Sequence, residues 1–156
     1  SLLLLCKIEN GQFADTRSVC LNDILAHYLD DYKEVYAYRN ITVTVTTDSL
    51  FCVEMNDSLV SVLVTNLLKN SFVHNIDGGF IYIKITADTF EISNTGEKPL
   101  DRERIFERFY KRKKKEGSTG LGLALVDSIC KANHLKIDYT YVENRHIFTI
   151  SKQNSE

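Results

Sequence analysis

The chain lacks the sequence features of zinc-binding, secreted and membrane-spanning proteins. Its four cysteines are widely spaced and include no CxxC pair, which argues against a zinc site or a redox motif. We therefore expect Cys6, Cys20, Cys52 and Cys130 to be small apolar core residues in a reducing compartment. The apolar run Leu2–Leu5 is far too short to span a membrane, and it lacks the flanking signals of a secretory peptide.

An excess of positive charge is also lacking. The 19 Lys and Arg residues against 21 Asp and Glu leave a net charge of −2, so we expect no nucleic-acid partner and no general attraction to an acidic membrane. With 156 residues, 44% of them hydrophobic, the chain is long enough for one domain with its own core. It begins inside an apolar run without an initiator Met, and we expect it to be a piece of a longer protein.

Hydrophobic periodicity predicts helices and strands in alternation. Apolar residues recur at helical spacing after Asn22, and the segment after Asn56 or Asp57 is apolar nearly all round, so these polar residues are the predicted N-caps. Helices on one face of a mixed sheet would satisfy this order: an α+β fold, a two-layer α/β sandwich with about five strands and about three helices. The expected helices are 1–10, 22–39, 57–75, 101–106 and 120–133, and the expected strands are 13–19, 41–46, 81–85, 90–92, 135–141 and 146–151.

A small-residue segment, Gly117–Gly122, opens the helix expected from residue 120. The first backbone N–H groups of a helix have no partner within it and lie at the positive end of its dipole, which suits a phosphate. The basic run Lys111–Lys115 would add charge where a polyphosphate is held. A flexible, solvated loop is the alternative interpretation, because short glycine motifs are weak signals.

Two sets of amides are further candidate ligand groups. Asn66 and Asn70 continue the seam of Leu59 and Leu63 on the buried helix. They could bond a loop backbone, or an amide oxygen could coordinate Mg²⁺, which takes oxygen ligands and keeps phosphates and waters in its shell. Asn94, in Asn94-Thr95-Gly96, could form a turn, or its amide could pair with the edge of adenine.

Taken in order, four segments make the chain resemble the catalytic and ATP-binding domain of bacterial sensor histidine kinases, which has the Bergerat-type ATP-binding fold. Residues 66–75 (NLLKNSFVHN) resemble the asparagine box of this family, and 92–96 (ISNTG) its first glycine box. Residues 105–111 (IFERFYK) resemble the phenylalanine box, and 117–126 (GSTGLGLALV) the second glycine box. The resemblance covers nearly the whole chain, from about residue 15 to 151.

The resemblance implies that ATP and Mg²⁺ bind in one pocket. Asn70 would ligate the metal, His74 would pack against adenine, and Asn94 would read the adenine edge. Lys111 or Arg108 would supply charge from the lid, with Lys111 and Asn70 taking the catalytic part. The implied nucleotide contacts are Asn66, Asn70, His74, Asn94, Gly96, Arg108, Ser118, Thr119, Gly120, Leu121, Gly122 and Leu123.

The chain departs from the family pattern at several positions. Asn94 stands where the family usually carries Asp, which replaces a charge-assisted hydrogen bond with a neutral one and lowers the expected affinity by roughly tenfold. Val73 replaces a Lys of the asparagine box, and Ser118 replaces a glycine. Residues 97–99 (EKP) stand where the second glycine of the first box is expected. These changes leave open a degenerate domain that acts as a binding scaffold.

The resemblance also implies partners and domain boundaries. Residues 1–12 would end the helix of a dimerisation and phosphoacceptor domain, 13–152 would form the ATP-binding domain, and 153–156 a polar tail. The phosphoacceptor histidine would lie upstream, and a response regulator would be the later partner. We expect the fragment to be a monomer or weak dimer, and the whole protein to be a homodimer anchored in the inner membrane, with this domain in the cytoplasm.

Overall fold

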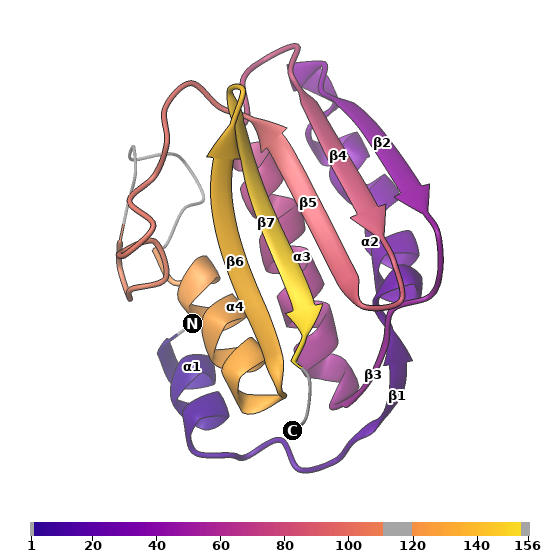
Figure 1. Cartoon of the computed structure of the whole chain (residues 1–156), viewed down its shortest axis with the longest axis vertical. Helices are drawn as coiled ribbons and strands as arrows, with labels where there is room; N and C mark the ends of the chain where they lie inside the picture. Colours follow the sequence, from indigo (N-terminus) through magenta and orange to yellow (C-terminus); the bar gives the residue numbers. More distant parts are fainter. Residues whose placement is uncertain (1, 111–119, 154–156) are drawn as a thin grey trace.

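The fold has a five-stranded sheet with helices on one of its faces and the other face open, and a separate two-stranded sheet (Figure 1). The structure, a computed structural model, describes residues 2–110 and 120–153. The helices are α1 (Leu2–Glu9), α2 (Leu21–Val35), the 3₁₀ helix η1 (Ala37–Arg39), α3 (Asp57–Val73) and α4 (Gly122–Ala132). The strands are β1 (Arg17–Cys20), β2 (Thr42–Thr47), β3 (Cys52–Met55), β4 (Phe80–Ile85), β5 (Thr89–Thr95), β6 (Leu135–Val142) and β7 (Arg145–Lys152).

The main sheet has five strands in the order β2-β4-β5-β7-β6. Strand β2 is parallel to β4 and every other neighbouring pair is antiparallel, which confirms the predicted mixed sheet. The turn between β6 and β7 is formed by Glu143 and Asn144, with φ of 51° and 62°. Two successive residues of positive φ match the right-handed twist of the strands that such a turn joins.

The core lies between this sheet and helices α2, α3 and α4, with α3 in the middle (Figure 1). Ile81, Ile83 and Ile85 of β4 are buried while the residues between them face outward or are partly covered, as the two-residue period of a strand requires. Helix α3 buries Leu59, Leu63 and seven further residues. This confirms the prediction of a largely buried helix and the two-layer α+β class.

The two predicted helix caps have different outcomes. Asn56 is the N-cap of α3, where its side chain accepts hydrogen bonds from the N–H groups of Ser58 and Leu59 at 3.0 and 3.3 Å. The prediction for Asn22 is wrong, because α2 begins at Leu21. Asn22 instead lies in the first turn of α2, where its amide donates to the carbonyl of Ser49 and accepts from the N–H of Phe51.

Three element predictions also need correction. Strand β3 was not expected; it pairs antiparallel with β1, which is only the last part of the predicted strand 13–19. Helix α2 ends at Val35, and η1 occupies the rest of the predicted helix. The segment 101–106 forms successive turns, in which the N–H groups of Arg104 and Ile105 donate to the carbonyl of Asp101, both at 3.0 Å.

The prediction that all four cysteines are apolar core residues is wrong for three of them. Cys20 and Cys52 form a disulfide between β1 and β3, and Cys6 is exposed. Only Cys130 is a buried free thiol, and burial, with a smaller effect of Asp127, raises its pKa to about 12. Within the described ranges, no helix is long and apolar enough to cross a membrane.

The Asn56 cap gives a direct test of how α3 begins. We expect Asn56→Ala to lower the free energy of unfolding by about 1 kcal/mol, because two N–H groups at the helix start lose their acceptor. Urea denaturation followed by circular dichroism measures this change. Asn56→Asp keeps the acceptor and should stay close to the parent protein; an equal loss in both variants would contradict the capping role.

Candidate functional site

The second half of α3 carries the two amides on its partly buried face. Asn66 and Asn70 lie one turn apart, and the Asn66 Nδ2 donates to the carbonyl of Val62 at 2.7 Å. A Cβ built on Gly122 would lie 3.0 Å from the Asn66 Oδ1. The start of α4 therefore contacts the amide face of α3, and two segments that are far apart in the sequence come together.

The start of α4 is built so that the backbone can approach this closely. Gly120 has a φ of 78°, which a residue with a side chain adopts only with strain. Leu121 is the N-cap of α4 and has no polar side chain to accept from the first N–H groups of the helix. Gly122 presents no side chain toward Asn66. The arrangement leaves a helix start with a positive dipole end beside a pair of amides.

His74 and Asn94 are in contact at the C-terminal end of α3. His74 is the C-cap of α3, and Asn94 is buried near the end of β5. The Asn94 Nδ2 donates to the carbonyls of His74 at 3.3 Å and Thr95 at 2.9 Å. Because both amide hydrogens are used by backbone carbonyls, only the Asn94 oxygen could interact with a nucleobase amino group. The predicted donation to a ring nitrogen would require these bonds to be exchanged.

Gly96 follows β5 and lies against a buried histidine on β7. A Cβ on Gly96 would overlap the ring of His146, so only glycine fits here. The N–H of Gly96 donates to the carbonyl of Asn144 at 2.9 Å, and its carbonyl accepts from the hydroxyl of Tyr141 at 2.9 Å. His146 Nδ1 shares a hydrogen bond of 2.8 Å with the hydroxyl of Tyr139. Gly96 is thus held by the β6–β7 turn.

Arg39 holds the end of α3 from a distant part of the chain. Its guanidinium donates to the carbonyls of Phe72, Val73 at 3.3 Å and Asn75 at 2.7 Å, and pairs with Asp77 at 2.9 Å. The Arg39 side chain is 13% exposed. The cation lies at the negative end of the α3 dipole and satisfies carbonyls that have no partner within the helix.

Asn75 completes this arrangement from within the following loop. Its Nδ2 donates to the carbonyls of Ser71 at 3.1 Å and Phe80 at 3.0 Å, and its Oδ1 accepts from the N–H of Ile76. A Cβ on Gly79 would overlap the Asn75 side chain. The five consecutive carbonyls of residues 71–75 thus all accept a hydrogen bond from a side chain, namely that of Asn75, Arg39 or Asn94.

Sequence reasoning missed the parts played by Arg39, Asn75 and His146. The sequence pattern marks Arg39 only as the end of the expected helix 22–39 and Asn75 only as the end of the expected helix 57–75. Nothing local marks Arg39, because its acceptors lie 33 to 36 residues further along the chain. Asn75 ends the segment that resembles the asparagine box, so its position in that motif was the available signal.

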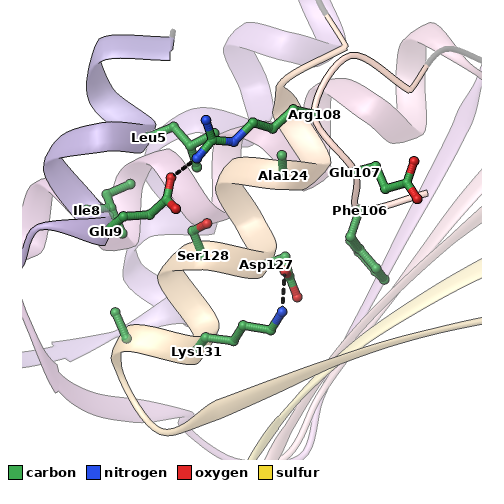
Figure 2. A pocket seen from close by; sticks show the side chains of 11 residues that line it. Leu5, Ile8, Glu9, Phe106, Glu107, Arg108, Ala124, Asp127, Ser128 and Lys131 are labelled. Carbon is green, nitrogen blue, oxygen red and sulfur yellow. Dashed lines mark hydrogen bonds and ion pairs between the residues drawn. The ribbon is translucent and has the colours of Figure 1, made fainter. Parts of the chain in front are cut away.

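Arg108 points away from these residues and toward α1. It forms an ion pair with Glu9 at the end of α1, beside a pocket of about 750 Å³ that lies between α1, α4 and the segment around Phe106 (Figure 2). Among the expected nucleotide contacts that lie in residues 2–110 and 120–153, only Arg108 lines this pocket. Its remaining charged groups include the ion pair of Asp127 and Lys131 on α4. Arg108 as a nucleotide contact remains a prediction.

Several predicted site residues lie outside the described ranges, and one packs against the core. Lys111, Ser118 and Thr119 fall in residues 111–119, outside the part of the chain that the structure describes. Leu123 is partly buried and packs against the core. Across residues 2–110 and 120–153, no three His, Cys, Asp or Glu side chains group as a metal site. A bound Mg²⁺ would therefore depend on an amide oxygen and on oxygens of the nucleotide and water.

Comparison with known proteins identifies the family. The model of the histidine kinase-, DNA gyrase B- and HSP90-like ATPase family matches residues 55–154. The chain belongs to this ATPase family. The matched region contains the amides of α3, Asn94, Gly96 and the start of α4, so the resemblance of the four segments is confirmed.

Curated relatives place the chain with the sensor kinases of this ATPase family. It is 32% identical over 141 residues to the sensor histidine kinase RppB of Synechocystis, covering 82% of this chain and 31% of that protein. It is 33% identical to the heme sensor protein HssS of Staphylococcus aureus, covering 99% of this chain and 35% of that protein. The chain thus spans about a third of the length of these relatives and is homologous to their histidine kinase ATPase region.

Solved structures share the fold of this ATPase domain. The histidine kinase AdeS of Acinetobacter baumannii has a TM-score of 0.77 at 20% identity, covering 99% of this chain and 76% of that one. The catalytic domain of histidine kinase ThkA has a TM-score of 0.76 at 22% identity, covering 89% and 95%. The mixed sheet with helices on one face is therefore the architecture of histidine kinase catalytic domains.

Arg39 should contribute more to stability than an exposed arginine. We expect Arg39→Ala to lower the free energy of unfolding by about 3 kcal/mol, because three backbone carbonyls lose a charged donor. The matched control is Arg17→Ala, whose side chain is 69% exposed in its ion pair with Asp57 and should cost less than about 1 kcal/mol. Urea denaturation compares the two. Equal losses would rule out a special role for Arg39.

Asn94 should not tolerate the aspartate that the family usually carries. We expect Asn94→Asp to lower the free energy of unfolding by about 1–3 kcal/mol, because a carboxylate would face the carbonyls of His74 and Thr95 without a donor. The control is Asn144→Asp, since Asn144 is exposed and its Oδ1 accepts from the Tyr141 hydroxyl at 3.2 Å. A gain in stability for Asn94→Asp in a thermal melt would contradict this donor role.

Proposed function

We propose that this domain binds Mg-ATP and transfers the γ-phosphate to a histidine on an upstream domain of the same protein. The observation that carries the proposal is the convergence of the amide face of α3 with the start of α4 at Asn66 and Gly122. The hydrogen bond from Asn94 to the His74 carbonyl adds the end of β5 to the same site. Family membership supports the use of ATP.

In this proposal each described residue has a separate task. The first N–H groups of α4 and the backbone around Gly120 would bind phosphate oxygens, since the helix start carries the positive end of the helix dipole and its N-cap, Leu121, has no polar side chain. Asn70 would hold Mg²⁺ through its amide oxygen, and Asn66 would contact the nucleotide one turn earlier. Bound Mg²⁺ supplies positive charge that neutralises the phosphates during transfer.

The base would bind where α3 ends beside β5. Asn94 would accept a hydrogen bond from the adenine amino group through Oδ1, and His74 would pack against the ring. The clamp by Arg39 and Asn75 on the last carbonyls of α3 would keep His74 and Asn94 at a fixed separation. Such positioning accounts for most of what phosphoryl transfer requires from a protein.

We propose transfer to a histidine rather than hydrolysis by water. ATP-hydrolysing relatives of this fold carry a Glu at the position that Asn66 occupies, one turn before the metal-binding Asn. A neutral amide cannot accept the proton of an attacking water, and the phosphoacceptor histidine is itself the nucleophile. The domain alone should therefore turn over ATP very slowly.

The partners and location follow from the same proposal. The phosphoacceptor domain would end in α1, with its histidine upstream, and a response regulator would take the phosphoryl group from it. The related kinase ThkA has been solved in complex with the response regulator TrrA, which supports a partner of this kind. The domain would lie in the cytoplasm, where ATP is available, in a homodimer anchored in the inner membrane.

A degenerate domain that signals by contact is the second candidate function. It is favoured by Asn94, whose two amide hydrogens are already used by backbone carbonyls, and by Val73 in place of a Lys. Such a domain would keep the fold and lose measurable affinity for nucleotide. Absence of heat and of a thermal shift at millimolar Mg-ATP would favour this alternative.

Asn70 is the sharpest test of the nucleotide site. We expect Asn70→Ala to weaken binding of Mg-ATP by at least about tenfold, since a metal contact is lost, and to leave binding of ATP in EDTA nearly unchanged. Isothermal titration calorimetry with and without Mg²⁺ measures both.

The control for Asn70 is Asn133→Ala. The Asn133 amide donates to a helical carbonyl, that of Ile129 at 2.8 Å, and this residue lies at the C-terminal end of α4. It should leave nucleotide affinity unchanged. Unaltered affinity for Mg-ATP in a folded Asn70→Ala variant would refute the assignment of this residue.

A further inference from the structure

Cys20 and Cys52 face each other across the short β1–β3 sheet. They are directly opposite in the antiparallel register, with Cα atoms 3.9 Å apart, and their sulfurs are joined in a disulfide. This sheet lies beside the ends of α2 and α3 and is separate from the five-stranded sheet (Figure 1).

Neighbouring contacts hold the two cysteines in place independently of the disulfide. The N–H of Leu21 donates to the carbonyl of Phe51 at 2.8 Å, and both side chains are fully buried. The Asn22 amide donates to the carbonyl of Ser49 at 3.1 Å and accepts from the N–H of Phe51 at 2.9 Å. Thiols fixed at such short range have a high effective concentration toward each other, which favours the internal disulfide over a mixed one.

The exposure of this pair differs from that of the other two cysteines. Cys20 and Cys52 are each partly exposed, so neither residue is enclosed in the core. Cys130 is buried, with a pKa raised to about 12 by burial, and Cys6 is exposed without a second cysteine beside it. Of the four thiols, only the pair has both access and a partner.

We propose that Cys20 and Cys52 are a reversible redox-modification site that exchanges with a small disulfide of the oxidised glutathione class. The inference uses the cytoplasmic location proposed above, because a disulfide in a reducing compartment is generally a transient one. One cysteine thiolate attacks the small disulfide and releases one small thiol. The second cysteine thiolate attacks the mixed disulfide and releases the other, so two cysteine thiols are oxidised and one disulfide is reduced to two thiols.

Closing this bond would affect the helix that carries the candidate nucleotide residues. The covalent loop from Cys20 to Cys52 contains α2, η1 and β2, and therefore Arg39, which binds the C-terminal carbonyls of α3. Strand β3 leads directly to Asn56, the N-cap of α3. The disulfide thus restrains segments that contact both ends of α3, and oxidation should stabilise the folded domain.

The test is a redox titration of the whole chain. Purified reduced protein is equilibrated at graded ratios of reduced to oxidised glutathione, trapped with an alkylating reagent and mapped as peptides without reduction. We expect the Cys20–Cys52 peptide to appear and disappear reversibly with the ratio, while Cys6 and Cys130 do not form a link. The oxidised protein should melt roughly 5–10 °C higher than the reduced one.

Matched variants separate the pair from the remaining thiols. Cys20→Ser and Cys52→Ser should each abolish both the linked peptide and the shift in melting temperature, whereas Cys6→Ser and Cys130→Ala should keep them. Three results would overturn the proposal: full alkylation of both cysteines at the most oxidising ratio, a glutathione adduct without the internal bond, or a bond that excess glutathione cannot reduce in the folded protein. None of these readouts depends on nucleotide binding.

Discussion

The carbonyls at the C-terminal end of α3 need hydrogen-bond donors, and the surrounding structure supplies them. A helix leaves its last carbonyls without partners, and a buried carbonyl without a donor costs stability. Here residues 71–75 find donors in Arg39, Asn75 and Asn94, which come from η1, the loop after α3 and β5. One set of hydrogen bonds therefore fixes α3 to three separate parts of the fold. The same bonds set the place of His74 beside Asn94.

Close approach of backbone is the second constraint on the site. Gly122 allows the start of α4 to reach the Asn66 amide, and Gly96 allows the end of β5 to reach the His146 ring. A side chain at position 96 would overlap the His146 ring, and one at position 122 would require the Asn66 amide to shift by a few tenths of an ångström. The glycines of the two boxes thus serve packing within the protein as well as any contact with phosphate.

Asn94 shows how a departure from a family pattern can be absorbed. An aspartate has no hydrogen to donate, whereas the Asn94 amide donates to two backbone carbonyls. The exchange gives up a negative charge at the proposed base pocket and gains two hydrogen bonds within the fold. The pair of partly exposed cysteines beside α2 and α3 adds a chemical property for which the ATPase family motifs give no signal.

The class of fold, the mixed sheet, the Asn56 cap and the family can be predicted from the amino-acid sequence, because these depend on residues close together in the chain or on motifs in order. The roles of Arg39, Asn22 and the cysteine pair emerge only from the folded arrangement, since their partners lie about 30 residues away. Strand β3 was not predicted, because four residues are too few to show the two-residue alternation of a strand. Local patterns record which residues are buried, but hydrogen bonds and disulfides between distant segments arise only once packing has brought those segments together.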